Sequence, residues 1–181
     1  LELAEKIIAQ AGINQLRLAK EAGLGIIACG VAAAYLEEGF EIAQAYGFRP
    51  ETASILEIKA SHPFPSKEVS QLLDRCPTVL VLEELEAYIE KSVYVMAQKL
   101  GYRGRIVGKL DGTLSRIGEY GVKQVVQGIS AALKLDLPET LFNAGQEGLK
   151  LAAARPITVC AGCPHRGTYM AINQAIKRLK L

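Results

Sequence analysis

Leu24-Gly-Ile-Ile-Ala-Cys-Gly30 is a continuous apolar run that stops at a glycine. A strand with no polar face is typical of a parallel sheet that helices cover on both sides. Apolar residues then recur at helical spacing from Val31 to Tyr46, which predicts a helix of about four turns. The stretch therefore predicts a first β-α unit, and the rest of the domain repeats its pattern.

Three more strands follow, each with a helix after it. The predicted strands run from Ser54 to Lys59, from Thr78 to Leu82 and from Arg105 to Val107. Strands that alternate with helices favour an α/β fold with a mainly parallel sheet and helices on both faces. The predicted helices cover residues 66–75, 87–100 and a segment that ends at Lys134.

The segments around this domain are predicted to be helical or to be linkers. Apolar residues fall on one face of a helix over residues 1–10, and Gly12 ends it because glycine readily takes the left-handed conformation of a helix end. Residues 13–22 are predicted to be a linker. A weak helical pattern from Glu139 to Leu151 lies in a second linker, residues 136–154.

Two glycines have the spacing of a phosphate-binding P-loop. Gly25 and Gly30 match that motif, but Val31 stands where the motif requires lysine. Gly23 and Gly25 also fail as a dinucleotide fingerprint, since they precede the strand and the fingerprint needs its glycines after it. The sequence therefore argues against a nucleotide site here.

The polar residues near the strand ends are predicted to have structural roles. Glu83 and Glu84 follow the third strand, and adjacent strand residues point to opposite faces, so they cannot readily act as an acid-base pair. Their predicted role is to complement the positive end of the next helix. Ser66 is the predicted cap of its helix, and His62, beside two prolines, is predicted to stabilise its loop.

Another strand-turn-helix pattern lies near the end of the chain, in Arg155-Pro-Ile-Thr-Val-Cys-Ala-Gly-Cys-Pro-His-Arg-Gly167. The β-branched run from Ile157 to Val159 predicts a strand. Two thiols should therefore lie at the carboxyl end of a strand, where open α/β sheets bind ligands. Thr168 is the predicted cap of the next helix, in which Met170, Ile172, Ala175, Ile176 and Leu179 recur at helical spacing.

Cys160 and Cys163 are separated by two residues, a spacing that serves iron-sulfur clusters, zinc sites and dithiol centres alike. A c-type haem is excluded, because Pro164 stands where a histidine would have to follow Cys163. Zinc has three candidate ligands in Cys160, Cys163 and His165, without a convincing fourth nearby. A tight turn with incidental thiols is the remaining alternative.

The residues around this pair resemble a known family. Cys160-Ala-Gly-Cys-Pro-His-Arg-Gly167 resembles the opening of the thiamine-diphosphate-binding domain in the alpha subunit of indolepyruvate ferredoxin oxidoreductase. The region from about Gly23 to Lys134 is similar to the domain before it, which resembles the carboxy-terminal domain of transketolase-like enzymes. The matching pieces are Gly25-Ile-Ile-Ala-Cys-Gly30, His62-Pro-Phe-Pro65 and Val79-Leu-Val-Leu-Glu-Glu-Leu85.

The resemblance implies an order of domains. Residues 1–22 would be a helix and linker, and residues 23–135 a transketolase C-terminal-like α/β domain. Residues 136–154 would be a second linker, and residues 155–181 the first β-α unit of a truncated thiamine-diphosphate-binding domain. The chain would then be an internal fragment of a longer subunit.

The resemblance also implies an activity for that longer protein. It would decarboxylate an aryl 2-oxoacid oxidatively, with thiamine diphosphate and magnesium, pass the acyl group to coenzyme A, and send electrons through 4Fe-4S iron-sulfur clusters to ferredoxin. A beta subunit would be its partner in a homo- or hetero-oligomer. The fragment by itself is expected to bind none of these cofactors and to be inactive. One alternative is a non-catalytic interaction or oligomerisation domain of a pyruvate or other 2-oxoacid oxidoreductase, and another is a thiol or zinc module.

The site residues that the resemblance implies all lie in the last segment, and none of them is assigned a catalytic role. Cys160 and Cys163 would supply half of an iron-sulfur site, which needs four thiolates. Cys29 and Cys76 are expected to be structural, because both lie in apolar surroundings. The residues expected near the thiamine site are Cys160, Gly162, Cys163, His165 and Arg166.

Composition excludes several other classes of protein. Half of the residues are hydrophobic and the net charge is only +2, with basic and acidic residues dispersed, so nucleic-acid binding lacks a basic patch. The longest apolar run, Ala22 to Leu36, is shorter than the roughly 20 residues that span a bilayer. Four cysteines without dense spacing favour the reducing cytoplasm.

Overall fold

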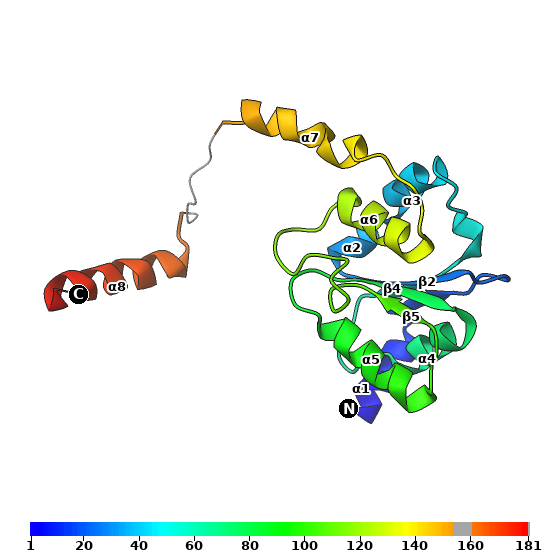
Figure 1. The fold of residues 1–181 in the computed structure, drawn as a ribbon. Helices are drawn as coiled ribbons and strands as arrows, with labels where there is room; N and C mark the ends of the chain where they lie inside the picture. Colours follow the sequence, from blue (N-terminus) through cyan, green and yellow to red (C-terminus); the bar gives the residue numbers. More distant parts are fainter. Residues whose placement is uncertain (154–160, 181) are drawn as a thin grey trace. The chain divides into compact units, whose positions relative to one another are not determined.

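A sheet of five strands forms the centre of the larger part of the molecule in the computed structural model (Figure 1). The structure describes residues 1–153 and 161–180, which fall into two units, Leu1–Phe142 and Asn143–Leu181. The strand order is β1-β3-β2-β4-β5. The strands are β1 (Gln15–Arg17), β2 (Leu24–Cys29), β3 (Ala53–Ile58), β4 (Thr78–Leu82) and β5 (Arg105–Val107).

Helices cover both faces of this sheet (Figure 1). β2, β3, β4 and β5 are parallel, and only β1 runs antiparallel, against β3. The predicted α/β fold with a mainly parallel sheet is therefore confirmed. One face carries α2 (Val31–Ala34), α3 (Leu36–Gln44) and α6 (Val122–Leu133), and the other carries α4 (Ser66–Arg75) and α5 (Tyr88–Leu100). Two further elements are α1 (Glu2–Gln10) and a short 3₁₀ turn, η1 (Pro50–Thr52).

The central strand β2 is buried on both sides, as its apolar run predicts. Leu24, Ile26 and Ala28 contribute to the core under α3 and α6, and Ile27 contributes to the core under α4 and α5. Gly25 lets α4 pack closely, since a Cβ there would lie 2.7 Å from Leu72 Cδ2. Burial of this strand on both faces is what fixes it at the middle of the sheet.

The prediction of one helix from Val31 to Tyr46 is wrong in one respect, because this segment forms two helices, α2 and α3. Tyr35, with φ −94° and ψ 0°, separates α2 from α3. The break redirects α3 so that Gly39 faces Val125 of α6, where a Cβ would overlap the valine side chain. Periodicity cannot detect this change of direction, since the apolar spacing continues through it.

Strand β1 was not predicted, since residues 13–22 have the composition of a linker. Asn14 holds this segment to the end of β3: its Oδ1 accepts hydrogen bonds from the N–H groups of Lys59 and Ala60, both at 2.9 Å. Its Nδ2 also donates to the Ala60 carbonyl at 3.0 Å. Arg17 adds an ion pair with Glu57 at 3.0 Å. A three-residue strand is too short for alternation to reveal it.

Helices α7 (Thr140–Leu151) and α8 (Pro164–Leu179) follow α6 along the chain. Helix α7 confirms the weak helical pattern, and α8 confirms the last predicted helix. Thr168 was wrong as its cap, because Cys163 is the N-cap and Pro164 takes the first helical position, where its missing N–H costs nothing. The predicted strand from Ile157 to Val159 lies outside the described residues.

The cap predicted for α4 was also wrong by one residue. Pro65 is the N-cap, and the Ser66 hydroxyl donates to the Phe64 carbonyl at 3.3 Å instead of capping the helix. Within the described ranges, no helix combines the length and apolar composition needed to cross a membrane.

Candidate functional site

The carboxyl ends of the parallel strands hold a cluster of polar residues, of which Glu83, Glu90 and Lys109 are charged and buried. The chain leaves β2 toward α2 and α3 on one face and leaves β4 toward α5 on the other, so this edge is the topological switch point of the sheet. Open α/β sheets bind ligands at such a point. The carboxyl-edge cluster, as we call it, consists of Glu83, Glu84, Glu90, Lys109 and Tyr120.

Glu83 caps helix α5. Its Oε2 accepts hydrogen bonds from the N–H groups of Tyr88 at 3.1 Å and Ile89 at 2.8 Å, and its Oε1 accepts one from Glu90 at 2.9 Å. These are three of the N–H groups that a helix leaves unpaired at its start. The predicted role of Glu83, complementing the positive end of the next helix, is therefore confirmed.

Glu84 has a different role from its neighbour. Its Oε1 accepts a hydrogen bond from the Tyr120 N–H at 2.8 Å, which holds the end of the loop that follows β5. The two carboxylates thus reach different partners, as expected for adjacent strand residues. The predicted helix-capping role applies to Glu83 and was wrong for Glu84.

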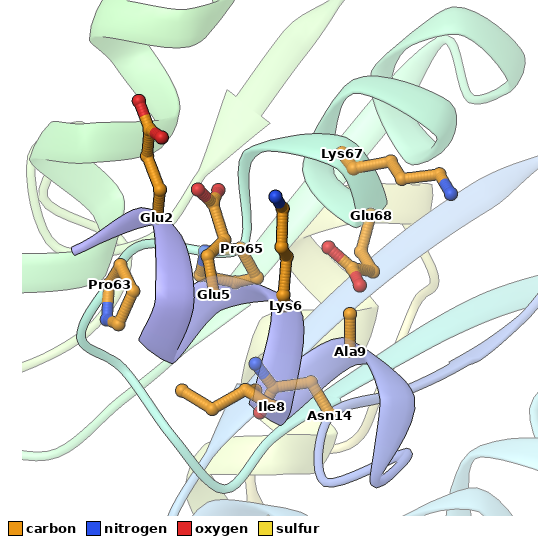
Figure 2. Close-up of a pocket in the computed structure, with 10 residues that line it drawn as sticks. All are labelled: Glu2, Glu5, Lys6, Ile8, Ala9, Asn14, Pro63, Pro65, Lys67 and Glu68. Atoms are coloured by element: carbon orange, nitrogen blue, oxygen red, sulfur yellow. The ribbon is translucent and has the colours of Figure 1, made fainter.

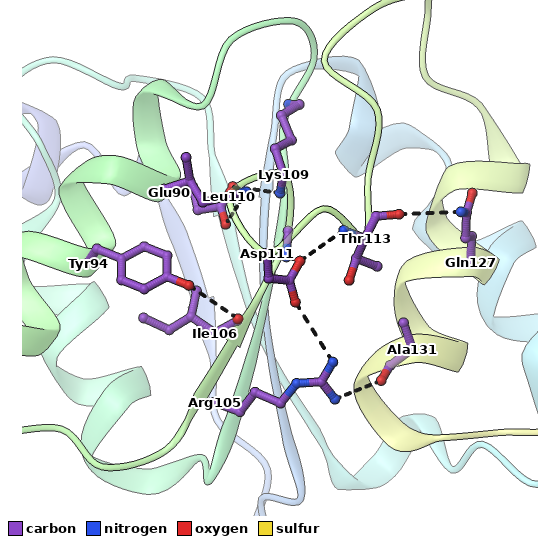
Figure 3. Close-up of polar contacts among 11 residues, drawn as sticks. Glu90, Tyr94, Arg105, Ile106, Lys109, Leu110, Asp111, Thr113, Gln127 and Ala131 are labelled. Carbon is purple, nitrogen blue, oxygen red and sulfur yellow. Dashed lines mark hydrogen bonds and ion pairs between the residues drawn. The ribbon is translucent and has the colours of Figure 1, made fainter.

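Glu90 is fully buried in α5, although an acid on a helix is usually exposed. Its Oε2 accepts a hydrogen bond from the Lys109 N–H at 2.7 Å, and its Oε1 accepts one from the Leu110 N–H at 3.1 Å (Figure 3). Burial raises the pKa of Glu90, and this effect outweighs those two hydrogen bonds. Gly108 leaves room for the carboxylate, since a Cβ there would lie 2.6 Å from Glu90 Cδ.

Lys109 is the buried cation of the cluster, with only 4% of its surface exposed. Its Nζ donates to the Glu83 carbonyl oxygen and lies 4.9 Å from the centre of the Tyr120 ring. Burial lowers the pKa of Lys109, although the nearby glutamates oppose this shift. Burial likewise raises the pKa of Tyr120, to about 12.

Further polar contacts fix the loop after β5 to helix α6 (Figure 3). Gln127 Nε2 donates to the Thr113 carbonyl at 3.3 Å, and Arg105 Nη1 donates to the Ala131 carbonyl at 2.9 Å. Asp111 Oδ1 accepts the N–H groups of Gly108 and Thr113. One bond therefore joins the loop to α6, one joins β5 to α6, and the two bonds of Asp111 lie within the loop.

The hydrogen bonds of the carboxyl-edge cluster join β4, α5 and the loop after β5. Among the described residues, every buried side-chain nitrogen or oxygen has a hydrogen-bond partner. The sequence did not single out Glu90 or Lys109, because both look like ordinary surface charges. The available signal was Gly108-Lys109 placed directly after a strand end, where a ligand site is expected.

Cys29 and Cys76 have environments that support their predicted structural role. Both are free thiols, Cys29 half-buried and Cys76 buried. Burial raises the pKa of both thiols, and Glu83 raises that of Cys29 further. A protonated thiol is a poor nucleophile and metal ligand. Over residues 1–153 and 161–180, no group of three or more histidine, cysteine or acidic side chains is arranged to hold a metal ion.

The predicted thiamine-site residues are described in part. Cys160 lies outside the described residues, so the geometry of the Cys160–Cys163 pair is not part of the structure. Cys163 Sγ lies 3.3 Å from His165 Nδ1, and the Arg166 N–H donates to the Cys163 carbonyl at 3.1 Å. Gly162, with φ +79°, makes the turn before them. Cys163, His165 and Arg166 therefore share the start of α8.

A pocket of about 280 Å³ lies between α1 and the loop before α4 (Figure 2). Ile8, Ala9, Pro63 and Pro65 give it apolar walls, and charged side chains of α1 and of the first turn of α4 surround it. The polar group of Asn14 is already bonded to the backbone of residues 59 and 60. Asn14 is therefore already engaged, and the remaining polar groups of the lining are the charged side chains of Glu2, Glu5, Lys6, Lys67 and Glu68.

The fold places the chain in a structural class. A solved structure described as "Split gene transketolase, inactive beta4 tetramer" aligns with it at a TM-score of 0.51 and 15% identity, over 68% of this chain and 43% of that chain. The described α/β domain therefore has the fold of a transketolase domain.

Comparison with sequence relatives narrows the class of protein further than the fold does. The indolepyruvate oxidoreductase subunit IorA of Methanothermobacter marburgensis is 35% identical over 159 residues, which is 88% of this chain and 24% of the relative. IorA of Archaeoglobus fulgidus is 29% identical over 99% of this chain and 28% of the relative. The predicted resemblance to the alpha subunit of indolepyruvate ferredoxin oxidoreductase is confirmed, and the chain is related in sequence to IorA. It spans about a quarter of the length of these relatives, and no protein-family model matches it.

Proposed function

We propose that this chain is a segment of the alpha subunit of a 2-oxoacid:ferredoxin oxidoreductase of the indolepyruvate type. The observation that carries the proposal is the 35% identity with IorA over 88% of the chain. The complete enzyme would convert an aryl 2-oxoacid such as indolepyruvate to an acyl-coenzyme A and pass electrons to ferredoxin. Its relatives are named as subunits, which supports a beta subunit as partner. The cytoplasm is the proposed location.

In this proposal the α/β domain is a scaffold and the last segment contributes to the thiamine site. Complete pairing of the buried polar groups in the carboxyl-edge cluster supports the first part. Bound thiamine diphosphate supplies an electron sink for decarboxylation, and magnesium accompanies its diphosphate. The start of α8, which carries Arg166 beside the positive end of the helix, suits an anionic group. Cys160, Gly162, Cys163, His165 and Arg166 are the proposed residues near this site.

Two cysteines of this chain are proposed as ligands of an iron-sulfur cluster. A cubane cluster takes four thiolates, and Cys160 and Cys163 would supply two of them in the complete protein. Cys163 is the cysteine that the structure describes in the second unit, and its thiol is free. The other thiolates would have to come from outside this pair, so the chain alone is expected to hold neither cluster nor thiamine.

The test is an assay of the complete gene product that contains this chain, purified without oxygen together with its partner subunit. Reduction of a viologen dye is measured with indolepyruvate, pyruvate or 2-oxoglutarate, each with and without thiamine diphosphate and coenzyme A. We expect thiamine-dependent reduction that is fastest with the aryl 2-oxoacid. Turnover of none of the three acids would contradict the proposed activity, and preference for pyruvate would contradict the indolepyruvate type.

A second candidate is a non-catalytic interaction or oligomerisation domain. The hydrogen-bonded buried groups of the carboxyl-edge cluster favour it, and one solved structure with this fold is described as an inactive tetramer. Light scattering during size-exclusion chromatography gives the mass of the 181-residue chain in solution. A concentration-independent monomer would contradict self-association.

A third candidate is a thiol or zinc module at the start of α8. A thiolate and an imidazole that bind one tetrahedral zinc ion lie about 3.5 Å apart, given the usual bond lengths. The 3.3 Å between Cys163 Sγ and His165 Nδ1 is close to this value. Native mass spectrometry with and without chelator tests it: a zinc adduct that the chelator removes would support the module, and the apo mass alone would contradict it.

A further inference from the structure

A groove lies on the surface between the start of α4 and helix α5, and the proposed function uses none of the residues that line it. Its volume is about 310 Å³. Phe64, Val95 and Met96 supply apolar surface, and Lys91 and Lys99 supply positive charge. This α4–α5 groove contains two ammonium groups and no carboxylate among its lining residues.

The apolar surface of the groove is only partly used by the domain itself, since Phe64 and Met96 are half-buried and pack against the core under α4 and α5, whereas Val95 is exposed. Val95 is 53% exposed, and Tyr88, two turns earlier on the same helix, is 57% exposed. A β-branched residue is a weak helix former, so Val95 adds little helix propensity to α5, and about half of its surface is free for a contact. Met96 beside it has a flexible side chain that adapts to different partners. The groove therefore has the composition of a contact surface.

The two lysines are weakly engaged within the described chain. The closest carboxylate to Lys91 is that of Glu86 at 3.8 Å, and both side chains are more than half exposed, at 60% and 71%. Such surface pairs contribute little. Lys99 has no ion pair with any residue of the described ranges. Both ammonium groups are therefore available to a partner.

The geometry of α5 favours a helix as the occupant. Lys91 and Lys99 are eight residues apart, which is about 12 Å along the axis. Tyr88, Ser92, Val95 and Lys99 follow one another at spacings of four, three and four residues, so they form a ridge along the outer face of α5. Ridges of this kind pack into the grooves of a second helix.

The groove is also held rigid before any partner arrives. Ile89, Val93 and Ala97 bury the inner face of α5, and Glu83 fixes its start. Its end is closed by Gly101 in the left-handed conformation. A preformed surface loses little entropy on binding.

We propose that the α4–α5 groove docks an acidic amphipathic helix of a partner protein. Apolar side chains of that helix pack on Phe64, Val95 and Met96, and its carboxylates pair with Lys91 and Lys99. Recognition of this kind joins an apolar helix face to a complementary groove, with charge fixing the orientation. The inference is independent of the activity proposed above.

The experiment uses two labelled helical peptides of about 15 residues and the 181-residue chain. Both peptides carry leucine along one face and alanine elsewhere; one has glutamates flanking the leucines, and the other has lysines there. Binding is followed by fluorescence anisotropy. We expect the glutamate peptide to bind with a Kd below about 1 mM, and at least about tenfold more tightly than the lysine peptide.

Two variants locate the binding. Lys91→Glu/Lys99→Glu should weaken binding of the glutamate peptide at least about tenfold, and Val95→Asp should weaken it similarly. Lys20→Glu and Ile117→Asp are matched controls at exposed positions elsewhere and should leave it unchanged. Circular dichroism confirms that each variant is folded, which is expected because the changed side chains are exposed. The proposal is overturned if the two peptides bind equally, if neither binds by about 1 mM, or if the groove variants behave like the controls.

Discussion

Helices α5 and α8 are of similar length but differ in what happens at their first turn. In α5, the buried Glu83 carboxylate accepts three N–H groups, and the inner face of the helix packs into the core. In α8, Cys163 is the N-cap without a side-chain capping bond, and none of the described residues of the helix is buried. His165 and Arg166 lie in its first turn instead of an acid.

The first turns of α5 and α8 show two different roles for the start of a helix: one stabilises the fold, and the other can bind a ligand. A carboxylate at the start of a helix satisfies unpaired N–H groups and the positive end of the dipole, so nothing is left to attract a ligand. A terminus with a thiol, an imidazole and a guanidinium keeps its positive potential. This supports assigning stability to the carboxyl-edge cluster and cofactor contacts to the start of α8.

The largest expected effect comes from removing the α5 cap. Glu83→Ala leaves three N–H groups of α5 and the environment of Lys109 without their carboxylate, and should lower the free energy of unfolding by about 3 kcal/mol. Urea unfolding followed by circular dichroism measures this change. Glu86→Ala, at an exposed position in the same loop, is the control and should change it by less than about 0.5 kcal/mol. Equal effects of the two changes would show that Glu83 is not the cap that holds α5.

A smaller loss of stability is expected where Gly108 lies against the Glu90 side chain. Gly108→Ala places a Cβ 2.6 Å from Glu90 Cδ, so either the loop or α5 must move. Overpacking of this kind should cost about 2 kcal/mol, again measured by urea unfolding. Gly145→Ala, where nothing lies within 4 Å of the new Cβ, is the matched control. Unchanged stability of Gly108→Ala would mean that Glu90 does not approach the backbone of this loop.

Glu90 should give the folded domain a pH dependence of definite sign. Its pKa is raised above the ordinary value of 4.5, so the folded state holds a proton that the unfolded state releases. The associated stability is fully present below pH 4.5 and is lost as pH rises through the raised pKa. Glu90→Gln should remove this part of the pH dependence in unfolding experiments between about pH 4 and 7. An unchanged slope would contradict the effect of burial.

The smallest effect is expected at the other helix. Cys163→Ala should change the unfolding free energy of the α/β domain by less than about 0.5 kcal/mol, because the thiol caps no N–H group of α8. In the complete protein, the same substitution should lower iron content if the proposed cluster assignment is right. A destabilised α/β domain would contradict the distinction drawn between the two helix termini.

Much of the fold could be predicted because local signals agreed with the tertiary arrangement. The limits of β4, β5 and α4 match the sequence prediction residue for residue, since the two strands are short runs rich in β-branched residues and the apolar residues of α4 recur at helical spacing. Strand β1 could not be predicted, because its place depends on Asn14 reaching the backbone of residues 59 and 60. The break at Tyr35 is likewise set by packing between Gly39 and Val125.

The site was less predictable than the fold. Periodicity assigns charged residues to the solvent side, so the burial of Glu90 and Lys109 could not be inferred from their own sequence positions. Their partners are main-chain groups, which leave no trace in residue type. Glu83 was the exception, because a carboxylate directly before a helix has a physical reason to be there.

Asn14 has a mechanical consequence. Helix α1 buries none of its residues, so a pull on the start of the chain would peel α1 away against little resistance. The force would then reach the sheet at Asn14, whose side-chain amide is hydrogen-bonded to the backbone after β3. From there it would pass into the hydrogen bonds between β1 and β3. One side chain thus acts as an anchor that transmits tension to the sheet.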